Sequence, residues 1–485
     1  MINFILNDQD IATERPSGST VLDFIRYHKD LKGTKIGCRE GDCGACTILV
    51  GELVGEEVKY RTMTSCLMPL ANAAGKHIVT VEGINPADGS LTPVQQAMVD
   101  ESGTQCGFCT VGFVMSLTGF CLARSIEAHT QAGSLRSDAI SAIDGNICRC
   151  TGYKSIERAA LQVSNLMAEP PASAGGENVG GTRAVVPEYF VSIASRLEDL
   201  GKLTLNYATE PDRPLAQAVL TGGGTDLYVQ RPDDMTESAA APLLYNDALR
   251  AILDTGEYVE IGASATVTDL LESPVMRSIF PDLYKHLKLV SSTPIRNMAT
   301  LAGNFINASP IGDMTIWFLA LDAEIVFNST DGVTTGNDSE RSIFLKDLYS
   351  GYKQLAKSDD EIMTTIRFRN PANGFRFNFE KVCKRTYLDI ATVNTAISLQ
   401  MDADQIVDAH VSAGGVGPIP LYLKETSAFL SDKAVSAETI TTANEIMQSE
   451  ISPISDVRGT EQYKRLLLRQ LFTAHFYEFF GGRAV

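Results

Sequence analysis

Several features that would place this protein in a membrane, on nucleic acid or outside the cell are missing from its sequence. No apolar run in the 485 residues approaches the roughly 20 residues needed to span a bilayer. Basic residues are outnumbered, with 41 Lys and Arg against 59 Asp and Glu, and the net charge of −18 repels phosphate backbones and anionic lipid. The first residues, from Met1 to Asp8, lack the basic region of a secretion signal. We therefore expect a soluble cytoplasmic protein that binds neither nucleic acid nor a membrane.

Cysteine is nearly absent from the larger part of the chain, because nine of the ten cysteines precede residue 151 and only Cys383 follows. Disulfides are rare in a reducing compartment, where clustered cysteines more often bind metal or do chemistry. The six histidines have no ligand-like spacing, so we interpret them as structural or exposed. This uneven distribution of cysteine is the most informative feature of the composition.

The length predicts two to four domains, at about 100–200 residues per domain. Residues 1–88 are predicted to form a small mixed sheet with one helix over 22–27, strands over 2–6 and 47–50, and turns at Gly18, Gly33 and Gly51. Residues 89–166 are predicted to form a helical bundle. In this bundle Thr92, Pro93 and Gln95 mark one helix start, Thr110 is expected to cap a second helix, and a third covers 155–167.

The stretch 167–183 is rich in Pro, Gly and small residues and is predicted to be a linker. Strands and helices mix over 184–370. From 375 to 485 the pattern predicts strands over 375–382, 392–400 and 406–412, and then helices over 436–450 and 462–479.

Four cysteines near the N-terminus have the spacing of a plant-type [2Fe-2S] site. Cys38, Cys43 and Cys46 form a C-x4-C-x2-C run, and Cys66 follows at a distance. Glycines within the run allow the loop to approach a cluster closely and to adopt positive φ (Gly37, Gly41, Gly44). Structural zinc is the alternative, but zinc pairs usually come as two short C-x2-4-C units. The spacing therefore favours the cluster.

A second set combines C-x2-C at Cys106 and Cys109 with C-x-C at Cys148 and Cys150, in a helical context. This spacing alone fits zinc as well as a cluster. Two sets in one chain favour electron transfer, because one-electron carriers must lie close together. Two basic neighbours would offset the charge of a reduced cluster and raise its potential (Arg149, Lys154). Cys121, on an apolar helix face, is predicted to be buried, and neither it nor Cys383 is assigned a ligand role.

Together these motifs resemble the iron–sulfur domain of the molybdenum hydroxylases, the family that includes xanthine dehydrogenases and aldehyde oxidases. The resemblance rests on residues 37–46, 65–67, 105–109 and 145–153, and it covers essentially all of residues 1–160. It has one departure, since Val111 stands where the family commonly has proline, which should cost little at a first-turn position.

A glycine-rich stretch, 221–227, follows the apolar residues 218–220. Such a strand-to-helix turn can present backbone N–H groups to a phosphate, and an ordinary turn fits this stretch equally well. It is not G-x-G-x-x-G, so it is a weak candidate for a Rossmann loop. It resembles the flavin pyrophosphate loop of the family's FAD domain, which implies FAD contacts at Gly222, Gly223, Gly224, Thr225 and Asp226.

Residues 295–313 are rich in small residues and amides, as close backbone approach to a ligand requires, and Asp313 is suited to accept hydrogen bonds from ribose hydroxyls. The resemblance places FAD contacts on Thr300, Gly303, Asn304, Ser309 and Asp313, although Ala302 replaces the first glycine of the usual Gly-Gly-Asn. Lys381, in the stretch 381–391, matches a flavin-contacting position, and a solvated lysine is the alternative.

The resemblance thus implies a multidomain α+β protein. Its parts are a plant-ferredoxin-like β-grasp [2Fe-2S] domain (1–88), a helical-bundle [2Fe-2S] domain (89–166), the linker (167–183), an α+β FAD-binding domain (184–370) and an α+β C-terminal subdomain (375–485). No molybdenum-binding domain follows up to residue 485, so a separate large subunit is expected to bind the molybdenum cofactor. This arrangement resembles the small subunit of bacterial two-subunit xanthine dehydrogenases, which implies an (αβ)2 heterotetramer.

The implied activity is electron transfer during hydroxylation of xanthine, with no acid–base residue for hydroxylation in this chain. Electrons would pass from the molybdenum cofactor to the Cys106 set, where Gln105 matches a pterin-bonding position and is otherwise a surface amide. They would continue through the Cys38 set and FAD to NAD+. One alternative is the same role in a hydroxylase of aldehydes or N-heterocycles. Another is a flavin-free zinc or redox scaffold that is not an enzyme.

Overall fold

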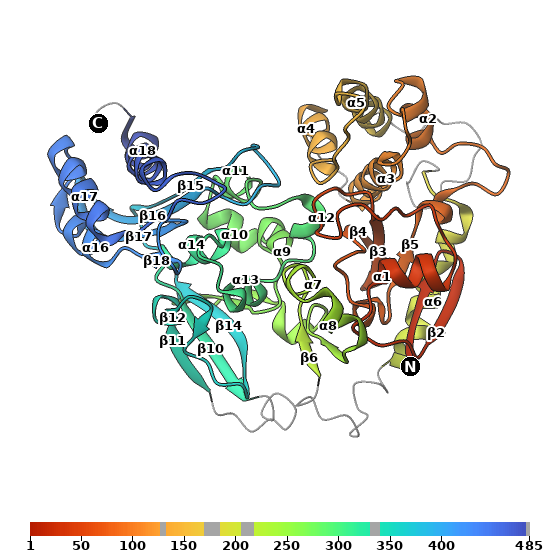
Figure 1. Ribbon diagram of the computed structural model, residues 1–485, viewed down its shortest axis with the longest axis horizontal. Coiled ribbons are helices and arrows are strands. Elements are labelled where there is room, and N and C mark those ends of the chain that lie inside the picture. Colours follow the sequence, from red (N-terminus) through yellow and green to blue (C-terminus); the bar gives the residue numbers. More distant parts are fainter. Residues whose placement is uncertain (127–131, 169–184, 205–217, 330–339, 482–485) are drawn as a thin grey trace. The chain divides into compact units, whose positions relative to one another are not determined.

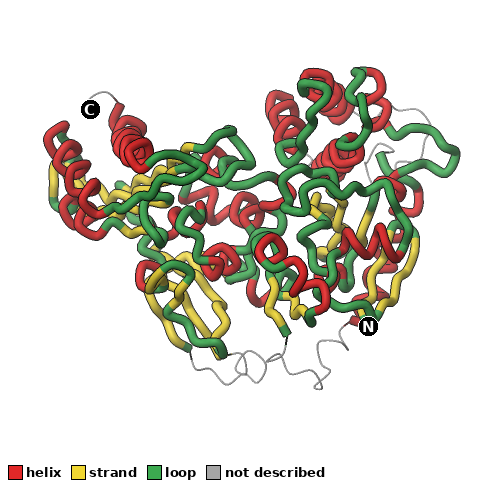
Figure 2. The backbone as a smooth tube through the Cα atoms, viewed as in Figure 1, coloured by secondary structure: helices red, strands yellow, loops and turns green. Residues whose placement is uncertain are grey.

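The computed structural model describes residues 1–126, 132–168, 185–204, 218–329 and 340–481, which fall into two compact units (Figures 1 and 2). Unit 1 comprises Met1–Leu243 together with Ser292–Met298, and unit 2 comprises Leu244–Ser291 together with Ala299–Val485. Nearly all of the predicted linker, from 169 onwards, lies outside the described residues. None of the helices described is both long and apolar enough to span a bilayer.

Unit 1 opens with a mixed five-stranded sheet of order β2-β1-β5-β3-β4, in which β1 and β5 are parallel and the other neighbours antiparallel. This agrees with the small mixed sheet predicted for the first 88 residues. Its elements are β1 (Ile2–Leu6), β2 (Gln9–Thr13), α1 (Val21–Asp23), the π-helical turn η1 (Phe24–His28), β3 (Thr47–Val54), β4 (Glu57–Thr64), the 3-10 turn η2 (Leu70–Ala73), β5 (His77–Val79) and the 3-10 turn η3 (Val81–Ile84).

The predicted turn at Gly51 is wrong, because Gly51 lies inside β3 opposite Tyr60 of β4. A Cβ at this position would come within 2.7 Å of the Tyr60 ring and 2.8 Å of the Val58 side chain. Glycine in a strand interior often marks such a close approach. The residue makes room for two neighbouring side chains rather than reversing the chain.

A four-helix bundle follows, built from α2 (Pro93–Asp100), α3 (Thr110–Ile126), α4 (Ala132–Ala142) and α5 (Lys154–Ala168). The predicted start of α2 is confirmed, since Thr92 Oγ1 accepts from Gln95 N at 3.2 Å and Gln95 Oε1 accepts from Thr92 N at 2.9 Å. Cys121 is buried on α3 as predicted. Thr110 is the first residue of α3 rather than its cap, and its hydroxyl pairs with that of Thr104 at 2.7 Å.

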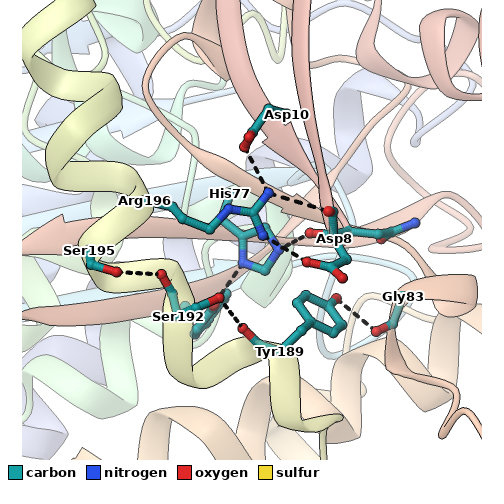
Figure 3. A network of polar contacts seen from close by, with 10 residues as sticks. Asp8, Asp10, His77, Gly83, Tyr189, Ser192, Ser195 and Arg196 are labelled. Carbon is teal, nitrogen blue, oxygen red and sulfur yellow. Dashed lines mark hydrogen bonds and ion pairs between the residues drawn. The ribbon is translucent and has the colours of Figure 1, made fainter.

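The helical segment η4 (Glu188–Ser192) and α6 (Ile193–Thr204) pack against the first sheet within unit 1, although the sequence assigned them to the start of the flavin region. Figure 3 shows the contacts. Arg196 pairs with Asp8 and with Asp10, each at 2.7 Å, and the Tyr189 hydroxyl donates to the carbonyl of Gly83 at 2.8 Å. These polar contacts fix the segment to the β1–β2 hairpin and to η3, which follows β5.

His77 lies at the centre of this network and is fully buried (Figure 3). Its ring is hydrogen bonded to the Tyr60 hydroxyl at 2.7 Å and to the carbonyl of Asn7 at 2.9 Å. Burial lowers the pKa of His77 to about 4, so the ring is neutral at physiological pH. The histidine is structural, as predicted.

The rest of unit 1 is a small parallel pair of strands with two helices. These are β6 (Val219–Thr221), α7 (Leu227–Gln230), α8 (Pro232–Glu237) and β7 (Ala240–Pro242), and unit 1 also contains α12 (Thr293–Arg296). The group packs on the first sheet's loops, where the Tyr228 hydroxyl donates to the carbonyl of Gly18 at 2.6 Å and the Ser17 hydroxyl donates to that of Ala240 at 3.1 Å.

Unit 2 contains an antiparallel sheet of order β11-β10-β14-β9-β8. Its core includes the fully buried Trp317, whose ring lies 4.5 Å from those of Phe280 and Phe377. The elements are η6 (Asp247–Leu249), β8 (Ile252–Asp254), β9 (Tyr258–Gly262), α9 (Val267–Glu272), α10 (Pro274–Ile279), α11 (Leu283–Leu287), α13 (Leu301–Asn307), α14 (Asp313–Leu319), β10 (Glu324–Ser329), β11 (Arg341–Phe344), η7 (Leu345–Asp347), β12 (Tyr349–Gly351), β13 (Gln354–Leu355) and β14 (Glu361–Arg369).

A second sheet of unit 2 has the order β15-β16-β17-β18, with β19 paired to β17. The side chains of β16 alternate, so that Ala396 packs in the core that contains α14 and Ile397 packs in the core that contains α17 and α18. The predicted strands and helices of this region are confirmed. They are β15 (Phe375–Val382), β16 (Val393–Asp402), β17 (Gln405–Gly414), β18 (Leu421–Tyr422), α16 (Lys424–Leu430), β19 (Lys433–Ala434), α17 (Ala437–Glu450) and α18 (Glu461–Phe480).

Candidate functional site

The first cysteine set lies in the loop before β3 and just after β4, and its thiols come together in two pairs. The sulfurs of Cys38 and Cys43 are in hydrogen-bonding contact, and so are those of Cys46 and Cys66. Cys46 and Cys66 are buried, whereas Cys38 and Cys43 are partly exposed. A [2Fe-2S] cluster takes four thiolates, two on each iron. Two adjacent pairs are the donor set that such a cluster requires.

The loop backbone supports these sulfurs. Glu40 N and Cys43 N donate to Cys38 Sγ at 3.3 and 3.4 Å, and Cys38 N donates to Cys43 Sγ at 3.4 Å. A Cβ at Gly37 would come within 2.5 Å of Cys43 Sγ, and φ is +76° at Gly41 and +67° at Gly44. The glycines therefore have the close approach and the positive φ that the sequence predicted for them.

Within each pair the thiols differ in acidity. Contact with the Cys43 thiol, aided by the backbone N–H donors, lowers the pKa of Cys38 to about 5. The Cys66 thiol likewise lowers the pKa of Cys46, while the same contacts and burial raise the pKa of Cys43 and of Cys66. A lowered pKa favours the thiolate, the form that ligates metal.

The second set also forms two pairs. Cys106 Sγ and Cys150 Sγ are 3.6 Å apart, and the Cys109 thiol contacts that of Cys148. Cys109 lies just before α3, and Cys148 and Cys150 lie just before α5. The Thr151 hydroxyl donates to Cys148 Sγ at 3.2 Å. Cys106 and Cys150 are exposed, unlike the buried Cys46 and Cys66.

Zinc and iron both bind cysteine thiolates, so the donor set by itself fits either metal.

The two cysteine sets are joined directly. Ile147 N, next to Cys148, donates to the carbonyl of Cys43 at 3.0 Å. The Asn146 amide donates to the carbonyl of Gly44 at 3.2 Å and accepts from the Ser116 hydroxyl at 2.7 Å. Loops from both domains therefore meet between the two sets, as one-electron carriers at close spacing require. Sequence reasoning did not single out Asn146, whose polarity between Gly145 and Ile147 gives only a weak signal.

Gln105 and the two basic neighbours of the second set are exposed. Lys154 pairs with Glu157 at 2.7 Å, so part of its charge is already offset within α5. The structure therefore gives Gln105 the position of a surface amide beside Cys106, and its role toward a pterin stays a prediction.

The glycine-rich stretch forms the turn between β6 and α7 in unit 1, with Gly224 at φ +83°. The Asn72 amide donates to the carbonyl of Gly222 at 3.0 Å, and a Cβ at Gly224 would come within 2.5 Å of the carbonyl of Leu67, which follows Cys66. The turn thus lies against the loop that carries the last cysteine of the first set. Thr225 and Asp226 continue it as partly exposed residues at the start of α7.

The other expected flavin contacts come together in unit 2, around α13 and the start of α14. Thr300 Oγ1 accepts from Gly303 N at 3.1 Å and so caps α13. Asn304 Oδ1 accepts from Thr315 N at 3.0 Å and from the Thr315 hydroxyl at 2.9 Å. Gly303 is exposed, and Ser309 Oγ accepts from Ile311 N at 3.4 Å. These polar side chains fix the local backbone, while Gly303 is left accessible to a ligand.

Asp313 and Lys381 form a buried ion pair. Lys381 Nζ donates to Asp313 Oδ2 at 2.7 Å and to the carbonyl of Leu289 at 2.8 Å, and the lysine side chain is only 1% exposed. The solvated lysine considered as an alternative is therefore wrong. Asn394, which faces Lys381 across β15 and β16, donates to Asp313 Oδ1 at 2.6 Å. An Asn inside a strand is unfavourable and was the one signal that could have found it.

Four family models match this chain. They are the 2Fe-2S iron–sulfur cluster binding domain over 4–71, the [2Fe-2S] binding domain over 80–161, the FAD binding domain in molybdopterin dehydrogenase over 193–370, and the CO dehydrogenase flavoprotein C-terminal domain over 379–479. These four domains fit the iron–sulfur and flavin part of a molybdenum hydroxylase. The predicted multidomain α+β fold is confirmed, and the matches support FAD and two [2Fe-2S] clusters as cofactors.

Known relatives are distant. Xanthine dehydrogenase from Blastobotrys adeninivorans is 28% identical over 95% of this chain and 39% of its own length, and xanthine dehydrogenase 1 from Arabidopsis thaliana is 27% identical over 96% and 38%. The chain therefore spans less than two fifths of these relatives. Among solved structures, reconstituted CO dehydrogenase from Oligotropha carboxidovorans matches 53% of this chain and 88% of its own, with 25% identity and a TM-score of 0.49.

Proposed function

We propose that this chain is the electron-transfer subunit of a xanthine dehydrogenase. It would take electrons from a molybdenum cofactor in a partner subunit and deliver them to NAD+. The observation that carries this proposal is the arrangement of eight cysteines as four adjacent pairs, two pairs in each of two domains that share backbone contacts. When bound, the two clusters and FAD would supply single-electron transfer and its conversion to a hydride.

The exposure of the cysteines supports an order for the two sets. Cys106 and Cys150 lie at the surface beside two exposed aromatic side chains, Phe108 at 47% and Tyr153 at 38% exposure. An iron–sulfur site this close to solvent is suited to exchange electrons with a second protein, and exposed aromatics are typical of interfaces. In the Cys38 set two thiols are buried, and the Gly222–Asp226 turn lies against Leu67, next to Cys66. This set is therefore suited to the internal step toward the flavin.

In this scheme the residues of the chain hold and orient the groups. Backbone N–H donors stabilise the thiolates of the first set, and the Thr151 hydroxyl does so in the second. For the flavin, we propose that the Gly222–Asp226 turn presents N–H groups to the pyrophosphate, and that the exposed Gly303 permits close approach. Asp313 has lone pairs beyond those used by Lys381 and Asn394, so it can still accept from a ribose hydroxyl.

The proposed overall reaction is xanthine + H2O + NAD+ giving urate + NADH + H+, with hydroxylation in a large molybdenum subunit and an (αβ)2 assembly. The names of the relatives favour xanthine. The alternative substrate classes, aldehydes and N-heterocycles, stay open because the substrate pocket is not expected in this chain. The FAD-domain match over 193–370 argues against the flavin-free scaffold. NAD+ as acceptor and a cytoplasmic location stay predictions.

The test is xanthine-dependent NADH formation by the complex purified through a tag on this chain. NADH that scales with the co-purified molybdenum subunit would support substrate, acceptor and partner together. A complex that contains flavin and molybdenum but does not oxidise xanthine would be consistent with the electron-transfer role. Its substrate should then be sought among aldehydes and N-heterocycles. The isolated chain should oxidise NADH with an artificial acceptor and be inert to xanthine, and xanthine turnover without a partner would contradict the proposal.

A further inference from the structure

A seven-residue segment, Ser292–Met298, belongs to unit 1 although the residues on both sides of it belong to unit 2. It is unusually buried for a short connecting segment. Ser292 and Met298 are fully buried, and Arg296 and Asn297 are 5% and 6% exposed. The next residue, Ala299, belongs to unit 2 and precedes the expected flavin residue Thr300.

The first contact is with the helical iron–sulfur domain. Arg296 Nη2 pairs with Asp144 Oδ2 at 2.6 Å, and Thr293 N donates to Asp144 Oδ1 at 2.7 Å. The paired side chains are 6% and 4% exposed. The Thr293 hydroxyl also donates to the carbonyl of Ser141 at 3.1 Å. Asp144, four residues before Cys148, is therefore bound through both of its oxygens.

The second contact is with the ferredoxin-like domain. The Asn297 amide donates to the carbonyl of Thr62 at 2.8 Å, near the end of the strand that leads to Cys66. The side chain of Ile295 lies where a Cβ on Gly41, between Cys38 and Cys43, would come within 2.7 Å of it. The segment therefore lies against both parts of the chain that supply the first cysteine set.

The third contact is with the glycine-rich turn. A Cβ on Gly223 would come within 2.0 Å of the carbonyl oxygen of Met298, so the backbones of the turn and the segment are packed as closely as glycine allows. One short segment thus joins the surroundings of both cysteine sets and the expected flavin pyrophosphate loop.

We propose that Ser292–Met298 is a positioning element that fixes the spacing of the two cysteine sets and the flavin loop, with Arg296 and Asp144 as its positioning residues. This inference rests on the proposed function, because fixed spacing matters where electrons pass between carriers and the rate falls steeply with distance. Neither residue contacts a reacting group. Removal of one partner of a buried ion pair leaves the other charge unpaired, so the segment should lose its docked position.

The test compares Asp144→Asn with a matched control, Glu52→Gln, in the full chain. Glu52, on β3, pairs with Lys76 at 3.0 Å, with side chains 18% and 13% exposed, and this pair includes neither Asp144 nor a residue of 292–298. Hydrogen–deuterium exchange needs no cofactor. Faster exchange over 292–298 is expected in Asp144→Asn and not in the control.

A second readout is the electron paramagnetic resonance of the two reduced clusters, whose magnetic coupling depends on their separation and orientation. Asp144→Asn should change this coupling while iron content and the spectrum of each separate cluster stay as in the wild type. If Asp144→Asn does not fold, Asn297→Ala, which leaves no buried charge, should give a smaller change in the same direction. Unchanged coupling and unchanged exchange in a folded, iron-replete variant would overturn the inference.

The two proposals fail in different ways. A wild-type chain without [2Fe-2S] signals would contradict the proposed function, and the exchange experiment would still decide whether the segment is held by Asp144. Normal [2Fe-2S] signals, together with unchanged coupling and unchanged exchange in Asp144→Asn, would contradict only the positioning role.

Discussion

The ion pair between Asp313 and Lys381 leads to a prediction that separates a structural role from flavin binding. In Asp313→Ala the Lys381 ammonium loses its hydrogen-bonded carboxylate and keeps the bond to the carbonyl of Leu289, in a site where its side chain is 1% exposed. Breaking a buried pair by removing one partner costs about 3–5 kcal/mol. At about 2–4 °C per kcal/mol for a domain of this size, the melting temperature of unit 2 should fall by roughly 6–20 °C.

The assay is calorimetric unfolding of the full chain for Asp313→Ala, Lys381→Met and the double variant. The double variant removes both charges, and replacement of a whole buried pair by apolar groups is often neutral. It should therefore be destabilised less than either single variant. The control is Glu478→Gln, which breaks the Lys285 pair with side chains 52% and 44% exposed and should cost less than about 1 kcal/mol.

The flavin content of the same variants separates a structural role of the pair from a role in flavin binding. If the double variant regains stability but not flavin, Asp313 contributes to binding beyond its structural role, and iron should be unaffected because every predicted cysteine ligand lies in unit 1. If the double variant regains both, the pair is structural only. If the melting temperature of Asp313→Ala equals that of Glu478→Gln, the reasoning is refuted, because loss of the carboxylate from a desolvated lysine should lower the stability.

Two further predictions concern unit 1 and the buried histidines. Cys43→Ser should abolish one of two [2Fe-2S] signals and leave the other, as measured by electron paramagnetic resonance and iron content, and retention of both signals would contradict the ligand assignment. Burial lowers the pKa of His77 to about 4 and of His475 to about 3, from 6.5 when unfolded. Their neutral forms therefore stabilise the fold above pH 6.5, and this contribution is lost as the pH falls toward 4 and then 3. The urea midpoint should drop over that range, whereas a midpoint that rises on acidification would show the sign to be wrong.

Much of the local structure could be predicted because it is encoded within a few residues. The capping box of Thr92 and Gln95 and the bounds of β15 follow from short-range pattern and hydrogen bonding alone. The cysteine sets were found for the same reason, since three of the first four fall within nine residues. Gly51 was misread as a turn because its cause, the ring of Tyr60, lies on another strand.

The contacts that organise the sites could not be read in this way. Asp144 and Arg296 are 152 positions apart, and Asn394 and Asp313 are 81 apart. The sequence assigned a flavin contact to Asp313 and singled out none of Asp144, Arg296 and Asn394. Only the fold shows which of these residues pair with one another. Spacing motifs identify the residues that carry the chemistry, whereas their supporting partners depend on tertiary packing.

Part of the region matched by the FAD-domain model packs within unit 1. The FAD-domain match covers 193–370, yet α6, the β6–α7 turn and Ser292–Met298 from this range all pack within unit 1. Tyr189 and Phe190, just before that range, complete the aromatic contacts around His77. Cutting the chain at the predicted linker would separate these elements from their sheet and leave Arg196 without Asp8 and Asp10. We therefore expect the iron–sulfur domains and the elements of the flavin region that pack within unit 1 to fold and lose stability together.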